Sequence, residues 1–198
     1  MTSRIRQVPH IEGNFATLVY VELSHHDTEN LMQYTNQCKE TLFKRFSGSV
    51  EDIVPHLSLS KHVFLKPHLI DGFLTKFRSV FPGAYSRTTA FLLPEVRLYS
   101  NESGDTCFGA VPVDLSISPS VLSLIKTIDS IFSAFDLSAF YVPSSPHVSL
   151  ACVSLSENLS GELIYPLTCS DEQLDELKVD IDCISIRIGK DVHRIPLG

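Results

Sequence analysis

Two short stretches of the sequence repeat the same residue types in the same order. PHLSL places His56 two residues before Ser58, and PHVSL places His147 two residues before Ser149, 91 residues later. One His-apolar-Ser-apolar match can arise by chance among eight histidines, but two that share a preceding proline and a final leucine indicate a shared function. In an extended strand alternate side chains share a face, so each stretch would present an imidazole beside a hydroxyl.

Two imidazoles and two hydroxyls in one cleft suit phosphoryl chemistry without a metal ion. Histidine has an unperturbed pKa of about 6.5, so one ring can accept a proton from an attacking hydroxyl while the other donates one to the leaving oxygen. Serine hydroxyls can donate to the non-bridging phosphate oxygens. His56 and His147 are therefore candidate catalytic residues, and Ser58 and Ser149 candidate phosphate-binding residues. The alternative, that all four only satisfy hydrogen bonds within a sheet, stays open on sequence alone.

The other histidines fit this chemistry less well. His25 and His26 adjoin Asp27 and are typical of a polar helix entry. His62 would share a strand face with His56 but would lie too far along for the same phosphate. No clustered His and Cys at metal-ligand spacing is present, so we expect no metal and no cofactor.

The elements that must position the two motifs follow from periodicity and from start and stop signals. The motif strands are expected at about 55–64 and 147–155. A helix over 27–46 would be capped by Asp27 and Thr28, and one over 118–135 by Ser118 and Pro119. Further predictions are a strand at 15–23, a helix within 66–81, a hairpin over 88–114 and a final hairpin that turns at Gly189 and Lys190.

Composition and charge limit the class of protein. A chain of 198 residues with 43% apolar and 20% charged residues is globular, and we expect a single two-lobed domain over 1–198. A net charge of −7 argues against nucleic-acid binding by broad electrostatic attraction, although not against a pocket for one or two nucleotides. No apolar run reaches the roughly 20 residues of a membrane span, and no signal peptide is evident. The five cysteines are expected to be buried apolar residues in a reducing, intracellular compartment.

The motif regions PHLSLSKHVFLKPHLIDGFLTKF and YVPSSPHVSLA resemble those of the U6 small nuclear RNA (snRNA) phosphodiesterase family, a branch of the 2H phosphoesterase superfamily. The resemblance implies an α+β fold with two pseudo-symmetric lobes, each an antiparallel sheet with flanking helices, and an active-site cleft between them. One motif strand would come from each lobe.

The same resemblance implies roles for individual residues. His56 would act as base and His147 as acid, an assignment that rests on analogy because the repeat makes the roles exchangeable. Tyr141, six residues before His147, would stack on a nucleobase, and Ser145 would contact the nucleotide. Tyr141 could instead simply pack the end of the preceding segment.

By resemblance the partner is an RNA 3′ end, the oligouridine tail of U6 snRNA. The enzyme would be a nuclear, metal-independent 3′–5′ exonuclease that shortens this tail and leaves a 2′,3′-cyclic phosphate. Some relatives open this cyclic phosphate to a monophosphate. We expect a monomer with no membrane association. Three alternatives remain: another 2H enzyme such as a cyclic phosphodiesterase of tRNA splicing or a 2′,5′-oligoadenylate hydrolase, an inactive module that binds RNA ends, and a structural scaffold.

Overall fold

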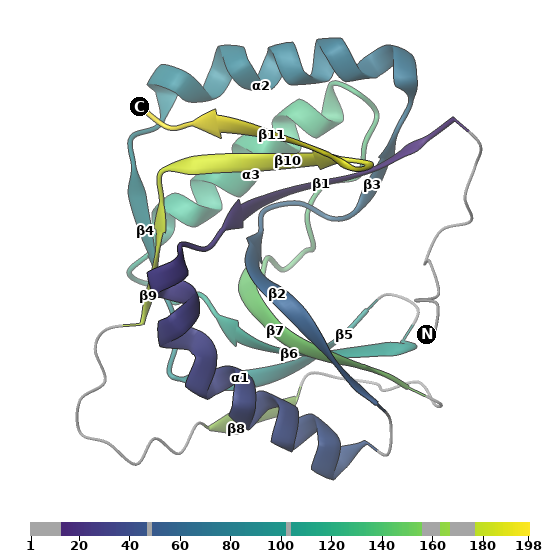
Figure 1. Cartoon of the computed structure of the whole chain (residues 1–198). Coiled ribbons are helices and arrows are strands. Elements are labelled where there is room, and N and C mark those ends of the chain that lie inside the picture. Colours follow the sequence, from purple (N-terminus) through teal and green to yellow (C-terminus); the bar gives the residue numbers. More distant parts are fainter. Residues whose placement is uncertain (1–12, 47–48, 102–103, 156–162, 167–176) are drawn as a thin grey trace.

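A computed structural model describes residues 13–46, 49–101, 104–155, 163–166 and 177–198 of the chain. Within these ranges helices and strands follow one another as in Figure 1. The helical elements are α1 (His25–Arg45), a short 3₁₀ helix η1 (Pro67–Leu69), α2 (Ile70–Ala84) and α3 (Pro119–Ser133). The strands are β1 (Phe15–Glu22), β2 (Val50–Ser58), β3 (Val63–Leu65), β4 (Thr88–Phe91), β5 (Glu95–Ser100), β6 (Thr106–Pro112), β7 (His147–Ser154), β8 (Leu163–Pro166), β9 (Lys178–Ile181), β10 (Cys183–Ile188) and β11 (Asp191–Pro196).

The strands form one long antiparallel sheet and one short one. In the part of the chain that the structure describes, the long sheet runs β11-β10-β1-β2-β7-β6-β5-β8, with β3 added to β1, and the short sheet pairs β4 with β9. The predicted α+β fold with antiparallel sheets is therefore confirmed. Because β1 pairs with β2, the strands on the β1 side of the long sheet and those on the β2 side share a continuous ladder of backbone hydrogen bonds and form the two halves of the molecule.

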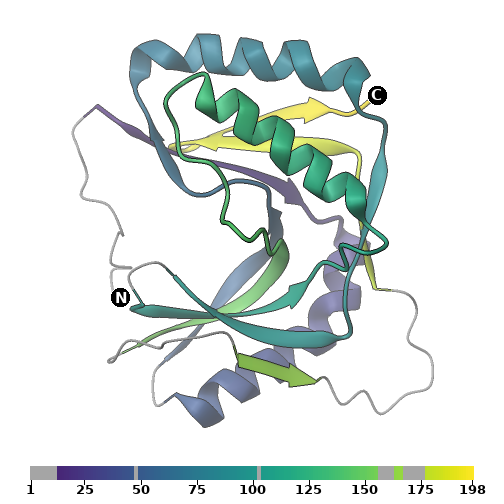
Figure 2. The same ribbon diagram turned by 180° about the vertical axis from the view of Figure 1, so that it is seen from behind.

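Helices cover opposite faces of this sheet in its two halves. The upper half in Figure 1 contains β1, β3, β10 and β11, with α2 above β11 and α3 behind β10; the view from behind in Figure 2 shows α3 in front of β10 and β11. In the lower half α1 lies in front of β2, β6 and β7. The predicted apolar stripe of α2 is buried, with Phe73, Phe77 and Phe81 fully enclosed.

The starts and ends of the helices have local causes. α1 begins at His25, two residues earlier than predicted, because Ser24 is the N-cap and its Oγ accepts from the Asp27 N–H at 3.0 Å. Asp27 is instead a first-turn carboxylate that accepts from the Ser24 hydroxyl. The helical backbone of α2 ends before Pro82 and Gly83, which have non-helical dihedrals.

Two predicted strands are divided in the structure. The stretch 55–64 is not one strand, since β2 ends at Ser58 and β3 begins at Val63; His62 therefore does not share a strand with His56, which corrects the expectation that it would. The hairpin expected over 88–114 is β5 with β6, whereas β4 pairs with β9. The predicted final hairpin is confirmed, and Gly189 takes the left-handed φ of +61° that its turn requires.

Three cysteines lie in the core. Cys38, Cys107 and Cys152 are buried, Cys183 is partly buried, and Cys169 lies outside the described residues. Burial raises the pKa of Cys38 to about 12 and that of Cys107 to about 11, so both thiols stay protonated at neutral pH. None of the described helices has the length and apolar character to cross a membrane.

Candidate functional site

The two motif strands are direct neighbours. β2 and β7 pair antiparallel, with His56 opposite Ser149 and Leu57 opposite Val148. The expectation of one motif strand from each lobe is wrong, because β2 and β7 both belong to the lower half in Figure 1 and pair with each other. Their antiparallel order places the histidine of each motif near the serine of the other.

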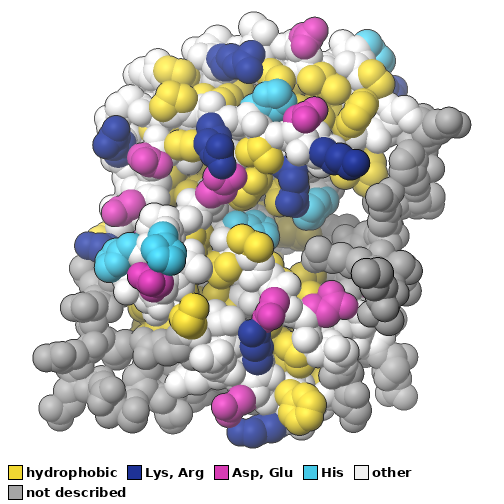
Figure 3. Space-filling view, viewed as in Figure 1, with side chains coloured by type: hydrophobic (Ala, Val, Ile, Leu, Met, Phe, Trp, Pro, Cys, Tyr) yellow, Lys and Arg dark blue, Asp and Glu magenta, His cyan; other side chains and the backbone are white. Residues whose placement is uncertain are grey.

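The alternation expected for these strands is present. Leu57 and Val148 have no exposed surface, whereas His56, Ser58, His147 and Ser149 are partly exposed. Directly opposite residues of paired strands point to the same face, so the imidazole and hydroxyl groups of both motifs share one face at the junction of the halves. Figure 3 shows this side of the molecule hollowed between the halves, with histidine side chains at the hollow and Lys and Arg side chains above it.

Both imidazoles are held in the same way. The Nδ1 of His56 lies 2.9 Å from the Val54 carbonyl oxygen, and the Nδ1 of His147 lies 2.8 Å from that of Ser145. A carbonyl only accepts, so Nδ1 carries the proton in each ring. Nε2 is then the nitrogen that can take a proton when the ring is neutral and release one when it is charged.

The proline shared by the two motifs accounts for this geometry. In each motif it stands between the histidine and the residue whose carbonyl accepts from Nδ1. A residue that precedes proline is restricted to extended conformations, which fixes the direction of that carbonyl. Neither carbonyl belongs to a paired position of the β2–β7 ladder, because the register shifts between Asp52 and His56 and because β7 begins at His147.

Each histidine also contacts a tyrosine of another strand, but the two contacts differ. Tyr99 of β5 stacks face to face on His147, with ring centroids 4.1 Å apart and planes at 12°. Tyr20 of β1 meets His56 edge-on, at 5.6 Å and 79°. The Tyr99 hydroxyl lies 3.3 Å from the hydroxyl of Ser145, whose carbonyl holds His147. The two halves of the repeat are thus not equivalent in structure.

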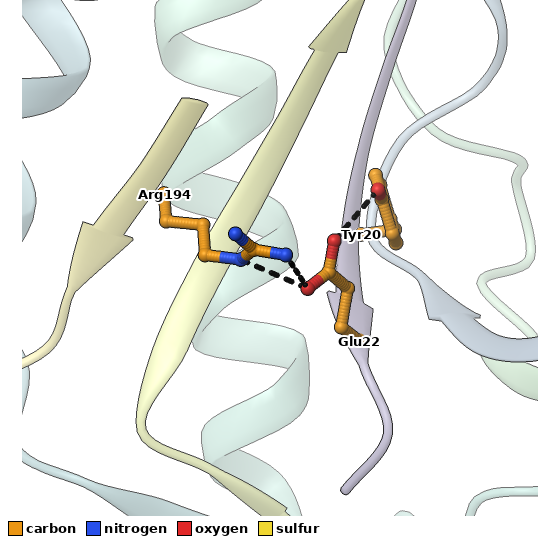
Figure 4. Close-up of polar contacts among 3 residues, drawn as sticks. All are labelled: Tyr20, Glu22 and Arg194. Carbon is orange, nitrogen blue, oxygen red and sulfur yellow. Dashed lines mark hydrogen bonds and ion pairs between the residues drawn. The ribbon is translucent and has the colours of Figure 1, made fainter. Parts of the chain in front are cut away.

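Tyr20 belongs to a chain of polar contacts that ends on β11 (Figure 4). Its hydroxyl donates to Glu22 Oε1 at 3.1 Å, and Arg194 donates to Glu22 Oε2 through Nε at 2.9 Å and a terminal nitrogen at 2.6 Å. Burial, the hydrogen bond to Glu22 and the Glu22 charge raise the pKa of Tyr20 above its ordinary value. Tyr20 therefore remains a hydrogen-bond donor at neutral pH.

The predicted nucleotide-binding residues lie in the loop before β7. Tyr141 is exposed at 44%, and the Lys61 ammonium lies 4.3 Å from the centre of its ring. The neighbouring Phe140 is buried, meets Tyr141 edge-on, and donates its N–H to Asp129 of α3 at 2.8 Å. Phe140 thus packs the end of the preceding segment, and the Tyr141 side chain stays partly exposed.

Sequence reasoning missed the residues that surround the histidines. These residues come from strands whose pairing the sequence does not reveal; they are Tyr20, Glu22, Tyr99, Arg187 and Arg194. The one available signal was the polar residues that interrupt otherwise apolar strands on alternate positions, as in the C-terminal hairpin. Among the described residues, no group of three or more His, Cys, Asp or Glu could hold a metal ion.

Comparison with known proteins supplies a family. Residues 2–196 match the family described as "HVSL: Uncharacterised conserved protein", and the sequence at His147–Leu150 reads HVSL. The chain is 29% identical over 187 residues to U6 snRNA phosphodiesterase 1 of Drosophila melanogaster, covering 94% of this chain and 71% of the relative. It is 30% identical over 205 residues to U6 snRNA phosphodiesterase 1 of Mus musculus, covering 98% of this chain and 73% of the relative.

The fold has solved counterparts. The structure of Kluyveromyces marxianus Usb1 with uridine monophosphate superposes with a TM-score of 0.60 at 14% identity, covering 93% of this chain and 98% of that one. At this identity the likeness concerns the fold, and it agrees with the antiparallel two-part architecture described above.

Proposed function

This chain belongs to the HVSL family and to that of the U6 snRNA phosphodiesterases, and from that membership we propose that it is a 2H-type, metal-independent 3′–5′ exoribonuclease that shortens the 3′ oligouridine end of U6 snRNA in the nucleus. One observation carries the proposal. Two half-buried histidines lie on paired strands, each with Nδ1 bonded to the carbonyl two residues before and with a serine two residues after. This set supplies a base, an acid and two hydroxyl donors at one place.

The reaction is an in-line transfer within the RNA. His56 Nε2 removes the proton from the 2′-hydroxyl of the penultimate nucleotide, whose oxygen forms a bond to the adjacent phosphorus. The bond from phosphorus to the 5′-oxygen of the terminal nucleotide breaks, and His147 Nε2 gives that oxygen its proton. The products are a nucleoside with a free 5′-hydroxyl and an RNA that ends in a 2′,3′-cyclic phosphate. Addition of water with the two histidines in exchanged roles would open the ring to a monophosphate.

The two serines and Tyr141 hold the reacting groups. The hydroxyls of Ser58 and Ser149 donate to the non-bridging oxygens, where charge accumulates as the new bond forms. Tyr141 stacks on the base of the terminal nucleotide, and Ser145 contacts the same nucleotide. The Lys61 ammonium lies 4.3 Å from the centre of the Tyr141 ring, so a positive charge adjoins this position.

A gel time course with a 5′-labelled oligouridine tests the proposal. With excess EDTA and a 3′-terminal diol, the chain is expected to shorten the RNA one nucleotide at a time from the 3′ end, because imidazole and hydroxyl groups supply the catalysis. Mass spectrometry should find a 2′,3′-cyclic phosphate or its opened monophosphate on the shortened RNA. An RNA that stays intact, together with hydrolysis of 2′,3′-cyclic uridine monophosphate, would favour a cyclic phosphodiesterase, and activity lost in EDTA would indicate a metal nuclease.

The stack between Tyr99 and His147 gives a second prediction. An aromatic face favours a cation above it, so Tyr99 helps His147 to carry the proton that it must donate. Replacing Tyr99 by leucine is expected to lower kcat by about 2- to 4-fold at neutral pH with little change in KM, because a smaller fraction of the His147 rings then carries the proton. Tyr99→Phe keeps the ring and should retain kcat within about 2-fold. Equal kcat in Tyr99→Leu and the wild type would contradict this role, and thermal unfolding of both variants controls for their fold.

A further inference from the structure

A cavity of about 610 Å³ lies on one side of His56. Its walls come from β1 (Tyr20, Glu22), from the β10–β11 hairpin (Arg187, Arg194) and from the segment of β2 that ends at His56. Binding pockets for small ligands range over about 300–1,000 Å³, so this volume is large enough to accept a nucleotide. Within the described part of the chain, its lining includes neither His147 nor Tyr141. The β2 residues of the lining precede His56, whereas Tyr141 precedes His147 at the start of the antiparallel strand β7, so the cavity and Tyr141 lie toward opposite ends of the paired motifs.

The charges around the cavity are largely paired. Glu22 receives both hydrogen bonds of Arg194, as Figure 4 shows, and Asp52 forms an ion pair with Lys39 of α1. Glu51 is the third acidic residue of the lining. These pairs offset two of the three carboxylates, so the cavity does not present a strongly negative field to an RNA chain.

Arg187 is the remaining basic residue of the lining. It projects from β10, is exposed, and holds its guanidinium carbon 5.7 Å from the centre of the Tyr20 ring. Tyr20 in turn contacts His56, so the Arg187 cation lies one ring away from the proposed base. A guanidinium matches the geometry of a phosphate and forms charge-assisted hydrogen bonds with it.

We propose that this cavity binds the penultimate nucleotide of the RNA, with Arg187 contacting that nucleotide's 5′-phosphate. The inference rests on the proposed function. It follows from placing the terminal nucleotide at Tyr141, because the nucleotide that carries the attacking 2′-hydroxyl must then lie on the His56 side. In this arrangement the Glu22–Arg194 ion pair holds the Tyr20 hydroxyl, and the Tyr20 ring holds the Arg187 guanidinium beside the substrate.

Binding of two uncleavable dinucleotides tests the inference apart from catalysis. The probes are 2′-deoxy diuridine with and without a 5′-phosphate, which lack the attacking hydroxyl. Calorimetry should give a Kd for the wild type that is about 10-fold lower with the phosphate than without it, as expected for one charge-assisted contact. In Arg187→Gln this preference should fall to about 1-fold, while the Kd of the probe without the phosphate stays as in the wild type. Arg78→Gln, at an exposed arginine of α2, is the matched control and should keep the preference.

Two results would overturn the inference. One is a wild type that binds both probes equally, and the other is an Arg187→Gln variant that keeps the phosphate preference or weakens both probes alike. Neither depends on whether the chain cleaves RNA. Failure of the proposed function would instead be seen as an oligouridine that stays intact while the binding preference for the 5′-phosphate is measured as expected.

Discussion

Replacing His147 by alanine is expected to slow removal of the 3′-terminal nucleotide by about 10²- to 10⁴-fold, and His56→Ala should have an effect of the same size. Each ring supplies one proton transfer through Nε2, since its Nδ1 is bonded to a backbone carbonyl oxygen. Alanine has no group that can replace Nε2. Binding of the RNA should stay within several-fold of the wild type, since stacking and phosphate contacts remain. Initial rates on labelled oligouridine and fluorescence anisotropy on the 2′-deoxy analogue measure the two quantities.

His68→Ala is the matched control, because His68 is exposed on η1 and its loss should leave the rate unchanged. Activity near the wild-type level in either motif variant would remove the basis of the mechanism. A substrate whose leaving group is 4-nitrophenolate separates the two roles, since that group departs without a proton. On uridine 3′-(4-nitrophenyl phosphate), His147→Ala should recover most of its rate and His56→Ala should not; the reverse pattern would exchange base and acid.

Gly109→Ala is expected to destabilise the protein strongly. Gly109 lies on β6 beneath α1, where a Cβ would meet Cys38 Sγ at 1.9 Å and Leu42 Cδ1 at 3.5 Å. Both side chains are fully buried, so either the Cys38 thiol must leave its position or helix and sheet must separate locally to admit the methyl group. Overpacking of this kind costs about 1–3 kcal/mol and occasionally more. Urea unfolding of the wild type and the variant would measure the change in the free energy of unfolding.

A compensating substitution makes this prediction specific. Cys38→Ala removes Sγ and leaves its Cβ 3.6 Å from the added methyl, an ordinary contact, so the double variant should recover part of the lost stability. Gly72→Ala on α2 is the control: its Cβ would come no nearer than 3.7 Å to Phe135, and alanine is the better helix former. A Gly109→Ala protein as stable as the wild type would contradict the close packing of α1 on β6.

Local pattern was sufficient to predict most elements, whereas their pairing was not predictable. Apolar periodicity located α2 and α3, and alternation located β7 and the C-terminal hairpin, because burial of one face leaves a period in the sequence. The start of α1 was misjudged since Ser24, Asp27 and Thr28 can all act as caps, and only the backbone conformation decides which one does. The division of 55–64 depends on Ser60, whose buried hydroxyl accepts from the Val19 N–H at 2.9 Å, a contact 41 residues away in the chain.

The candidate site divides in the same way. The His and Ser residues of both motifs could be selected because repetition marks them, and each pair lies on one strand. Tyr99, Glu22 and Arg194 could not, since each acts through a cross-strand contact that exists only once β1, β5 and β11 have found their places. The shared proline is visible in the sequence, but its connection to the Nδ1 hydrogen bonds depends on the backbone conformation that each motif takes in the folded chain.

The path of the chain through the long sheet has a consequence for shortening the protein. β1 near one end of the chain and β10 near the other are adjacent in the middle of the sheet, and β1 also pairs with the strand that carries His56. The polypeptide passes between the halves several times, so no single cut would separate one half from the other. Trimming from either terminus as far as β1 or β10 would open the centre of the sheet rather than its edge, and would withdraw support from His56 before any motif residue was removed.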